Sequence, residues 1–213
     1  MPRFRFAPEG WVVIIPVVIL AALALLTQWY IAAIVLSAIA LFLLNFFRDP
    51  HRAGSERHVD VISPADGTVV LIKDVPDGEI WPGLTRQVSI FMSVFDVHVN
   101  RAPITGKIVH YRYMPGRKIA AMSHKSSAEN EQNLTVMTDA RGATLAFKQI
   151  AGLLARRIVF DKQEGDEVKR GDRIGMIKFG SRVDIFFPPT ATITVKVGDK
   201  VKVALSVIAE IPE

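Results

Sequence analysis

A long uncharged stretch near the N-terminus limits what this chain can fold into. No side chain between Trp11 and Phe47 carries a charge. A single straight helix of about 37 residues would be about 55 Å long, whereas a bilayer core is only about 30 Å thick. The polar and aromatic segment 27–30 divides the stretch into two apolar runs, 11–26 and 31–47. We therefore expect two hydrophobic helices that form a hairpin.

The arginines around this stretch indicate its orientation. Arg3 and Arg5 precede the first run, and Arg48, Arg52 and Arg57 follow the second. Because positively charged flanks stay in the cytoplasm, we expect an inner-membrane anchor with the rest of the chain on the cytoplasmic face. The apolar region is too long for a cleaved signal peptide. Each run is at the short end of the spanning range, so a shallow re-entrant hairpin is an alternative to two full spans.

The chain after the anchor has the pattern of a β protein. We expect a mainly β (α+β) protein, in which a compact β-sandwich or barrel-like domain over 51–213 follows the hairpin of 1–50. One short helix is expected between Ile119 and Gln132. The expected strands are rich in Val, Ile, Phe and Thr and are separated by Gly, Pro and Asp clusters, at 67–73, 87–95, 107–113, 134–138, 143–150, 173–179, 183–187 and 192–197.

Two pairs of segments in this part of the chain are similar to each other. Segment 63–69 is similar to 102–108, and segment 165–169 is similar to 198–202. Each has a turn followed by a strand, as in folded-over β-sandwich modules of the biotinyl or lipoyl type. Shared turn chemistry without common ancestry explains the similarity equally well, and both interpretations predict compact β structure.

Composition excludes several classes of function. The net charge is +5, but the sequence has no long basic run, so we expect an anionic lipid surface and not a nucleic acid as partner. The chain contains no cysteine, which excludes disulfides, thiolate metal sites and a catalytic cysteine.

The dipeptide Gly180-Ser181 opens an apolar run that is typical of a strand. If the Ser181 hydroxyl attacks the Gly180 carbonyl, the peptide becomes an ester, and β-elimination then cuts the chain and leaves a keto group at position 181. The protein would thereby make its own electrophile. A simple turn is the alternative, because Gly-Ser is common in turns.

A second polar cluster lies within 95–101. If this segment is a strand, its period of two places Asp96, His98 and Asn100 on one face, and His98 could transfer protons near neutral pH. On the pattern alone, the solvent-exposed face of a half-buried strand is the simpler interpretation.

Two further polar residues are candidates. Asp66 follows a proline and precedes a glycine, so it is expected in a tight turn, and turn formation alone would explain it. His124 could be a second proton carrier or a substrate contact, although its polar neighbours also fit an exposed loop. A metal site formed by His98 and His124 lacks an acidic ligand at a suitable spacing, so no metal is expected.

Taken together, these features resemble the phosphatidylserine decarboxylases, most closely the short, membrane-anchored bacterial kind. The matching segments occur in the same order as in that family. They are Phe47-Arg48-Asp49-Pro50, Ser63-Pro64-Ala65-Asp66-Gly67, Phe95-Asp96-Val97-His98-Val99-Asn100-Arg101-Ala102-Pro103, Glu129-Asn130-Glu131, and Phe179-Gly180-Ser181 followed by Val183.

The resemblance implies a proenzyme that cuts itself between Gly180 and Ser181. Its chains 1–180 and 181–213 would form a heterodimer, and a higher oligomer is compatible with the sequence. Ser181 would become a pyruvoyl group, the cofactor, which binds the amine of phosphatidylserine as a Schiff base and accepts electrons when carbon dioxide leaves. The product would be phosphatidylethanolamine.

The resemblance also implies roles for single residues. An aspartate matching Asp66 joins a histidine and the serine in a self-cleavage relay, and a histidine matching His98 assists decarboxylation. Here the relay histidine is replaced by Arg101, so His98 or His124 substitutes for it, or cleavage proceeds without that relay. Arg182 follows the serine where the family commonly has threonine, and it could contact an anionic headgroup.

Two other functions are alternatives to this one. A non-catalytic, membrane-tethered β-sandwich adaptor fits the hairpin and the internal similarity, but it gives no role to the Gly-Ser site. A membrane-anchored serine hydrolase would need a Gly-x-Ser-x-Gly motif, whereas Ser181 is followed by Arg182 and Val183.

Overall fold

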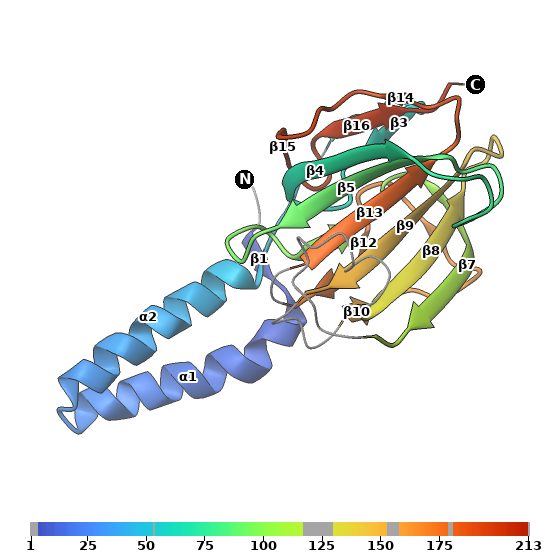
Figure 1. Ribbon diagram of the computed structural model, residues 1–213. Coiled ribbons are helices and arrows are strands. Elements are labelled where there is room, and N and C mark those ends of the chain that lie inside the picture. Colours follow the sequence, from blue (N-terminus) through green and yellow to red (C-terminus); the bar gives the residue numbers. More distant parts are fainter. Residues whose placement is uncertain (1–3, 53, 117–129, 153–157, 179–180, 213) are drawn as a thin grey trace. The chain divides into compact units, whose positions relative to one another are not determined.

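The computed structural model describes residues 4–52, 54–116, 130–152, 158–178 and 181–212. The chain forms two compact units, residues 1–51 and 52–213. The first unit is built around two helices, and the second consists of β-strands (Figure 1).

The first unit contains the expected helical hairpin. Helix α1 (Pro8–Leu26) begins at a proline, whose fixed φ and missing N–H suit the first turn of a helix. Helix α2 (Tyr30–Phe46) follows after three residues, and Gln28 between them has a φ of 59°. Beyond the open ends of the hairpin, β1 (Phe4–Phe6) pairs antiparallel with β2 (Arg48–Pro50).

The surface of this hairpin is apolar. The two helices bury small side chains such as Ala24, Ala33 and Ala40, whereas Leu26 and Ile31 are 79% and 83% exposed. A helix that is apolar all round is typical of a membrane segment or of a buried core. By length and composition, α1 is a candidate membrane span, and α2 is an apolar helix of 17 residues, shorter than the roughly 20 residues that a span usually has.

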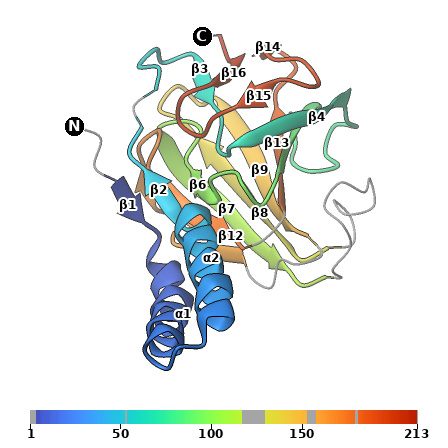
Figure 2. The same ribbon diagram turned by 90° about the vertical axis from the view of Figure 1, so that its left-hand side faces the viewer.

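The second unit consists of antiparallel sheets (Figures 1 and 2). Its eight-stranded sheet has the order β11-β7-β8-β9-β13-β5-β4-β15, and two three-stranded sheets have the orders β10-β12-β6 and β14-β16-β3. The strands are β3 (Asp60–Ile62), β4 (Gly67–Asp74), β5 (Arg86–Met92), β6 (Val99–Arg101), β7 (Gly106–Met114), β8 (Gln132–Thr138), β9 (Thr144–Ala151), β10 (Ile158–Phe160), β11 (Glu167–Val168), β12 (Arg173–Ile177), β13 (Ser181–Phe187), β14 (Thr192–Ile193), β15 (Lys200–Val201) and β16 (Val207–Glu210).

Side-chain alternation along β13 divides the interior into two parts. Val183, Ile185 and Phe187 lie on one face and have no exposed surface, and they join the main core together with residues of the small sheets such as Ile208. Phe186 lies on the opposite face and belongs to a smaller cluster with residues of the β4–β5 connection. Ser181 shares the face of the main core.

The internal similarity seen in the sequence corresponds to the same structure at both edges of the large sheet. The N–H of Val69 donates to the carbonyl of Asp199, and the N–H of Ile108 donates to the carbonyl of Asp166, both at 2.9 Å. Strand β15 pairs with β4 as β11 pairs with β7. The expected turn-then-strand units are therefore confirmed.

The mainly β fold is confirmed, and the large sheet is open, because its edge strands β11 and β15 are not neighbours. The helix expected between Ile119 and Gln132 falls mostly on residues 117–129, which lie outside the described residues, and β8 already begins at Gln132.

Candidate active site

Ser181 is the first residue of β13, in the middle of the eight-stranded sheet (Figure 1). It pairs with Met92 of β5 on one side and with Ala151 of β9 on the other, and it is completely buried. Its hydroxyl donates to Sδ of Met92 at 3.4 Å. Because a thioether is a weak acceptor and not a base, this contact holds the hydroxyl without removing its proton.

His98 lies just before β6 and is also completely buried. Its Nδ1 is 3.0 Å from the carbonyl oxygen of Asp96. A carbonyl oxygen only accepts, so Nδ1 carries the proton and the neutral ring has its lone pair on Nε2. The imidazole is therefore oriented to accept a proton at Nε2.

The predicted strand over 95–101 is wrong in its first half. The carboxylate of Asp96 accepts the N–H of Ser93 at 2.8 Å, and this side-chain bond competes with strand formation and closes a turn. Asp96 therefore does not share a strand face with His98 and Asn100. The alternative of a solvent-exposed face is wrong as well, because His98 and Asn100 have no exposed surface.

Three buried carboxamides form a hydrogen-bonded network on the Ser181 face of the sheet. Nδ2 of Asn133 donates to Oε1 of Gln149 at 2.8 Å, and Nε2 of Gln149 donates to Oδ1 of Asn100 at 2.7 Å. All three side chains have no exposed surface. Burial of an amide costs folding free energy unless its polar atoms are hydrogen-bonded, so each of these side chains needs its neighbour as a hydrogen-bond partner.

Asn100 connects this network to the serine. Its Nδ2 donates to the carbonyl oxygen of Pro64 at 3.3 Å and lies 3.8 Å from Sδ of Met92. Met92 therefore contacts both the network and the Ser181 hydroxyl. In this way β5, β6, β8, β9 and the turn before β4 are linked to the Ser181 hydroxyl through Met92.

Met92, Asn133 and Gln149 were missed by the sequence analysis. The signal that could have found the two amides is alternation, because Asn133 and Gln149 lie on the core-facing sides of β8 and β9. Nearby Tyr111 has a raised pKa because it is partly buried, and its hydrogen bond with Asn133 opposes the rise.

Asp66 is held by two partners. The guanidinium of Arg52 forms an ion pair with the Asp66 carboxylate and donates to Oδ2 at 3.1 Å. The N–H of Val203 donates to Oδ1 of Asp66 at 2.6 Å. The next residue must be a glycine, because a Cβ on Gly67 would lie 2.1 Å from the carbonyl oxygen of Phe91. Asp66 thus lies in the expected tight turn, and its described contacts fix that turn.

The remaining candidates are distributed as follows. Gly180 and His124 lie outside the described residues. Arg101, which the resemblance places at the relay histidine, donates from its guanidinium to the carbonyl of Gly171 at 2.8 Å, and a guanidinium has no acceptor atom to serve as the base. Among the described residues, no group of three or more His, Asp and Glu side chains could hold a metal ion.

The headgroup contact expected of Arg182 is wrong. Successive residues of a strand point to opposite faces, so Arg182 and Ser181 lie on different sides of the sheet. Arg182 is only 3% exposed, and its Nε donates to Asp184 at 2.6 Å.

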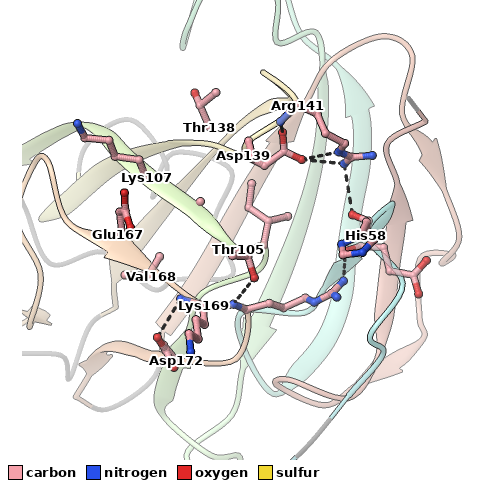
Figure 3. A pocket seen from close by; sticks show the side chains of 15 residues that line it. His58, Thr105, Lys107, Thr138, Asp139, Arg141, Glu167, Val168, Lys169 and Asp172 are labelled. Carbon is pink, nitrogen blue, oxygen red and sulfur yellow. Dashed lines mark hydrogen bonds and ion pairs between the residues drawn. The ribbon is translucent and has the colours of Figure 1, made fainter.

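Figure 3 shows a cavity of about 860 Å³. It lies at the other end of the sheet from Ser181. Its wall includes Thr138, which pairs with Thr144 of β9. Thr144 lies seven residues along β9 from Ala151, the neighbour of Ser181, and is therefore about 24 Å from Ala151. A terminal guanidinium nitrogen of Arg141, on this wall, lies 2.7 Å from Oδ2 of Asp139 and donates to the carbonyl oxygen of His58 at 3.3 Å. Asp139 and Arg141 of the wall bind each other, and we assign no ligand to this cavity.

A buried hydroxyl, a network of buried amides beside it and a buried imidazole with a defined tautomer are features of an enzyme active site. A model of the phosphatidylserine decarboxylase family matches residues 39–209. Proteins named phosphatidylserine decarboxylase proenzyme are similar along nearly the whole chain. The one from Solibacter usitatus is 50% identical over 194 residues, which cover 89% of this chain and 90% of the relative.

Two further relatives carry the same name. The protein of Magnetococcus marinus is 45% identical over 194 residues, or 91% of this chain and 89% of the relative. That of Symbiobacterium thermophilum is 39% identical over 213 residues, or 100% and 99% of the two chains. The chain therefore belongs to the phosphatidylserine decarboxylase family, and it is an enzyme. This excludes the non-catalytic adaptor.

Proposed function

We propose that this proenzyme cuts itself between Gly180 and Ser181 and that the pyruvoyl group formed from Ser181 then serves to decarboxylate phosphatidylserine to phosphatidylethanolamine. The main support is the buried hydroxyl of Ser181 at the first residue of the central strand. The chains 1–180 and 181–213 stay together as a heterodimer, because β13 is hydrogen-bonded on both sides to strands of the larger chain.

The cut proceeds in two steps. Oγ of Ser181 loses its proton to a base and bonds to the Gly180 carbonyl carbon while the peptide C–N bond breaks, so an ester and a free amine form. Removal of the Cα proton of residue 181 then breaks the Cβ–Oγ bond and releases the Gly180 carboxylate. The enamine left at position 181 takes up water and loses ammonia, which gives the keto group.

The surroundings of Ser181 fit the group that it would form. A pyruvoyl group replaces the amine with oxygen and the hydroxymethyl with a methyl, so it needs no additional space. The thioether of Met92 and the methyl of Ala151, the neighbours of position 181, suit a methyl group. When present, the group binds the substrate amine and accepts the electron pair left by carbon dioxide.

The polar candidate residues take different roles in this proposal. We assign to His98 the proton transfer at Nε2 during decarboxylation, and to His98 or His124 the removal of the Ser181 proton. Asp96 orients His98 through its carbonyl. Asp66, bound to Arg52, fixes the turn whose Pro64 carbonyl accepts from Asn100.

The intact mass of the denatured protein tests the proposed function. We expect two chains, ending at Gly180 and starting at position 181, and the smaller chain should be lighter than its serine-initiated mass by one ammonia. This follows because the amine of residue 181 leaves during processing. A single full-length species that stays whole on long incubation with lipid or detergent contradicts the proposal.

The apolar hairpin supports a membrane role for residues 1–50. We propose that it anchors the β domain, residues 51–213, to the cytoplasmic face of the cell membrane, because its apolar side chains are exposed and arginines flank it. Anchoring places the enzyme where its lipid substrate is confined.

Protease accessibility tests this orientation. Protease added to intact cells from which the outer envelope has been removed should leave the β domain whole, and lysis should make it cleavable. Digestion of the β domain before lysis contradicts the orientation. Release of the protein by high salt alone contradicts an anchor that is held by apolar contacts.

A further inference from the structure

The face of β13 opposite Ser181 carries an unusual set of buried polar groups. Arg182 is 3% exposed and Asp184 is not exposed at all, although both lie in the middle of the sheet. Charged residues are rarely buried to this extent unless they are paired.

Arg182 is bound at two points. Its Nε donates to Oδ1 of Asp184 at 2.6 Å, and its terminal nitrogen donates to Oγ of Ser89 at 2.8 Å. Ser89 belongs to the neighbouring strand β5, and its hydroxyl also accepts from Nε2 of Gln87 at 2.9 Å. One contact therefore lies within β13, and the other ties β13 to a strand of the larger chain.

A further cation faces this pair from the other side. Lys148 of β9 is the direct cross-strand neighbour of Asp184. Burial lowers the pKa of Lys148, and the nearby charges of Asp184 and Glu79 oppose this effect. Asp184 is thus shared between Arg182 and the adjoining strand, so it keeps a positive neighbour even without Arg182.

Arg182 is the residue directly after Ser181, so it lies beside the proposed cut. Under the proposed function, on which this inference rests, the peptide bond before residue 181 is cut, so Arg182 becomes the second residue of a new chain. Chain ends fray unless they are fixed, and the reacting carbonyl would be on the residue that frays first. The uncut chain has no such end at this place.

We propose that Arg182 is a positioning residue that anchors the new N-terminus of the small chain in the sheet after self-cleavage. The guanidinium acts from the face opposite the reaction and touches neither substrate nor cofactor. It holds the backbone of β13 to Asp184 and Ser89, so that residue 181 keeps its place between Met92 and Ala151.

Hydrogen exchange at residues 182–187 tests the anchor, with Ser181→Ala versions as uncut references. In the protein with Arg182, cutting should change exchange at these amides by no more than about threefold. In Arg182→Met, which keeps the apolar stem but loses both hydrogen bonds, the cut form should exchange roughly 100-fold faster than the uncut form. Arg182→Lys should give an intermediate value, because an ammonium cannot hold both partners in the same geometry.

Lys148→Met is the matched control, because it removes a buried cation from the same cluster on a strand that is not cut. Lys148→Met should change hydrogen exchange at residues 182–187 equally in the cut and uncut forms. If Arg182→Met does not fold, the double variant Arg182→Met/Asp184→Leu removes the pair without leaving a carboxylate, and the same ratio is expected. Equal exchange of cut Arg182→Met and the cut parent protein overturns the proposal.

Two further outcomes test the anchor and the proposed function separately. If the parent protein cleaves and Arg182→Met does not, Arg182 acts before the cut, and the anchor proposal is wrong while the proposed function stands. If the parent protein itself stays whole, the proposed function fails and the anchor fails with it.

Discussion

The Ser181→Ala protein is expected to stay whole and to show no decarboxylase activity. Alanine has no hydroxyl to attack the Gly180 carbonyl, so neither the ester nor the keto group can form. Activity should fall by at least about 10⁴-fold, because no other electrophile replaces the missing group. Intact mass and carbon dioxide release from phosphatidylserine vesicles measure the two effects on one preparation.

Loss of the fold would not explain this result. The substitution removes one hydrogen bond to a thioether sulfur, which contributes at most about 1 kcal/mol to the free energy of unfolding. Thr135→Val is the matched control, because it removes another buried hydroxyl on the same face of the sheet, one without a hydrogen-bond partner among the described residues. Thr135→Val should cleave itself like the parent protein. A cut Ser181→Ala chain would contradict the assignment of the nucleophile.

Patterns with a single physical cause were predicted well from the sequence. The hairpin follows from the absence of charge, and its break at 27–30 agrees with the end of α1 at Leu26 and the start of α2 at Tyr30. The β domain follows from Val- and Ile-rich runs between turn residues, and seven of the eight expected runs overlap strands of at least five residues. In these segments local preference and burial favour the same structure.

The errors occur where a side chain competes with the pattern or where a partner is distant in sequence. Asp96 was placed on a strand because alternation suggested it, but its carboxylate closes a turn with Ser93. Its place after Ser181 suggests that Arg182 could contact the headgroup, yet it pairs with Asp184 and Ser89 on the other face. Asp184 is two residues away and was within reach of an alternation argument, whereas Ser89 is separated from Arg182 by most of the domain.

The same distinction applies to the site. Ser181 and His98 could be selected from local motifs, but the amide network that reaches Ser181 through Met92 could not. Asn100 and Gln149 are 49 positions apart in the chain and lie in different sheets, so only the packing of the small sheet β10-β12-β6 against the large sheet brings them together. A single sequence contains no signal for a pair of this kind beyond the presence of amides at core-facing positions.

His98→Asn is expected to separate decarboxylation from folding. The amide nitrogen of asparagine can occupy the place of Nδ1 and donate to the carbonyl of Asp96, so the local hydrogen bond is kept. Asparagine has no group corresponding to Nε2, and proton transfer at that atom is lost. The turnover number of fully processed enzyme should fall by about 10²–10⁴-fold, the usual contribution of a general acid or base. Turnover is measured on vesicles and divided by the amount of small chain that carries the pyruvoyl group.

The comparison between processing and turnover decides what His98 does. If His98 also removes the Ser181 proton, His98→Asn should cleave itself more slowly as well, and if His124 does so, processing should keep its rate while turnover falls. His110→Asn makes the same substitution on β7, where the ring stacks on Trp81 at 5.3 Å, and both rates should stay close to those of the parent protein. A His98→Asn enzyme that is fully processed and turns over within about threefold of the parent contradicts a proton-transfer role, because such roles contribute at least about 10²-fold. The buried imidazole would then serve only to fill the space before β6.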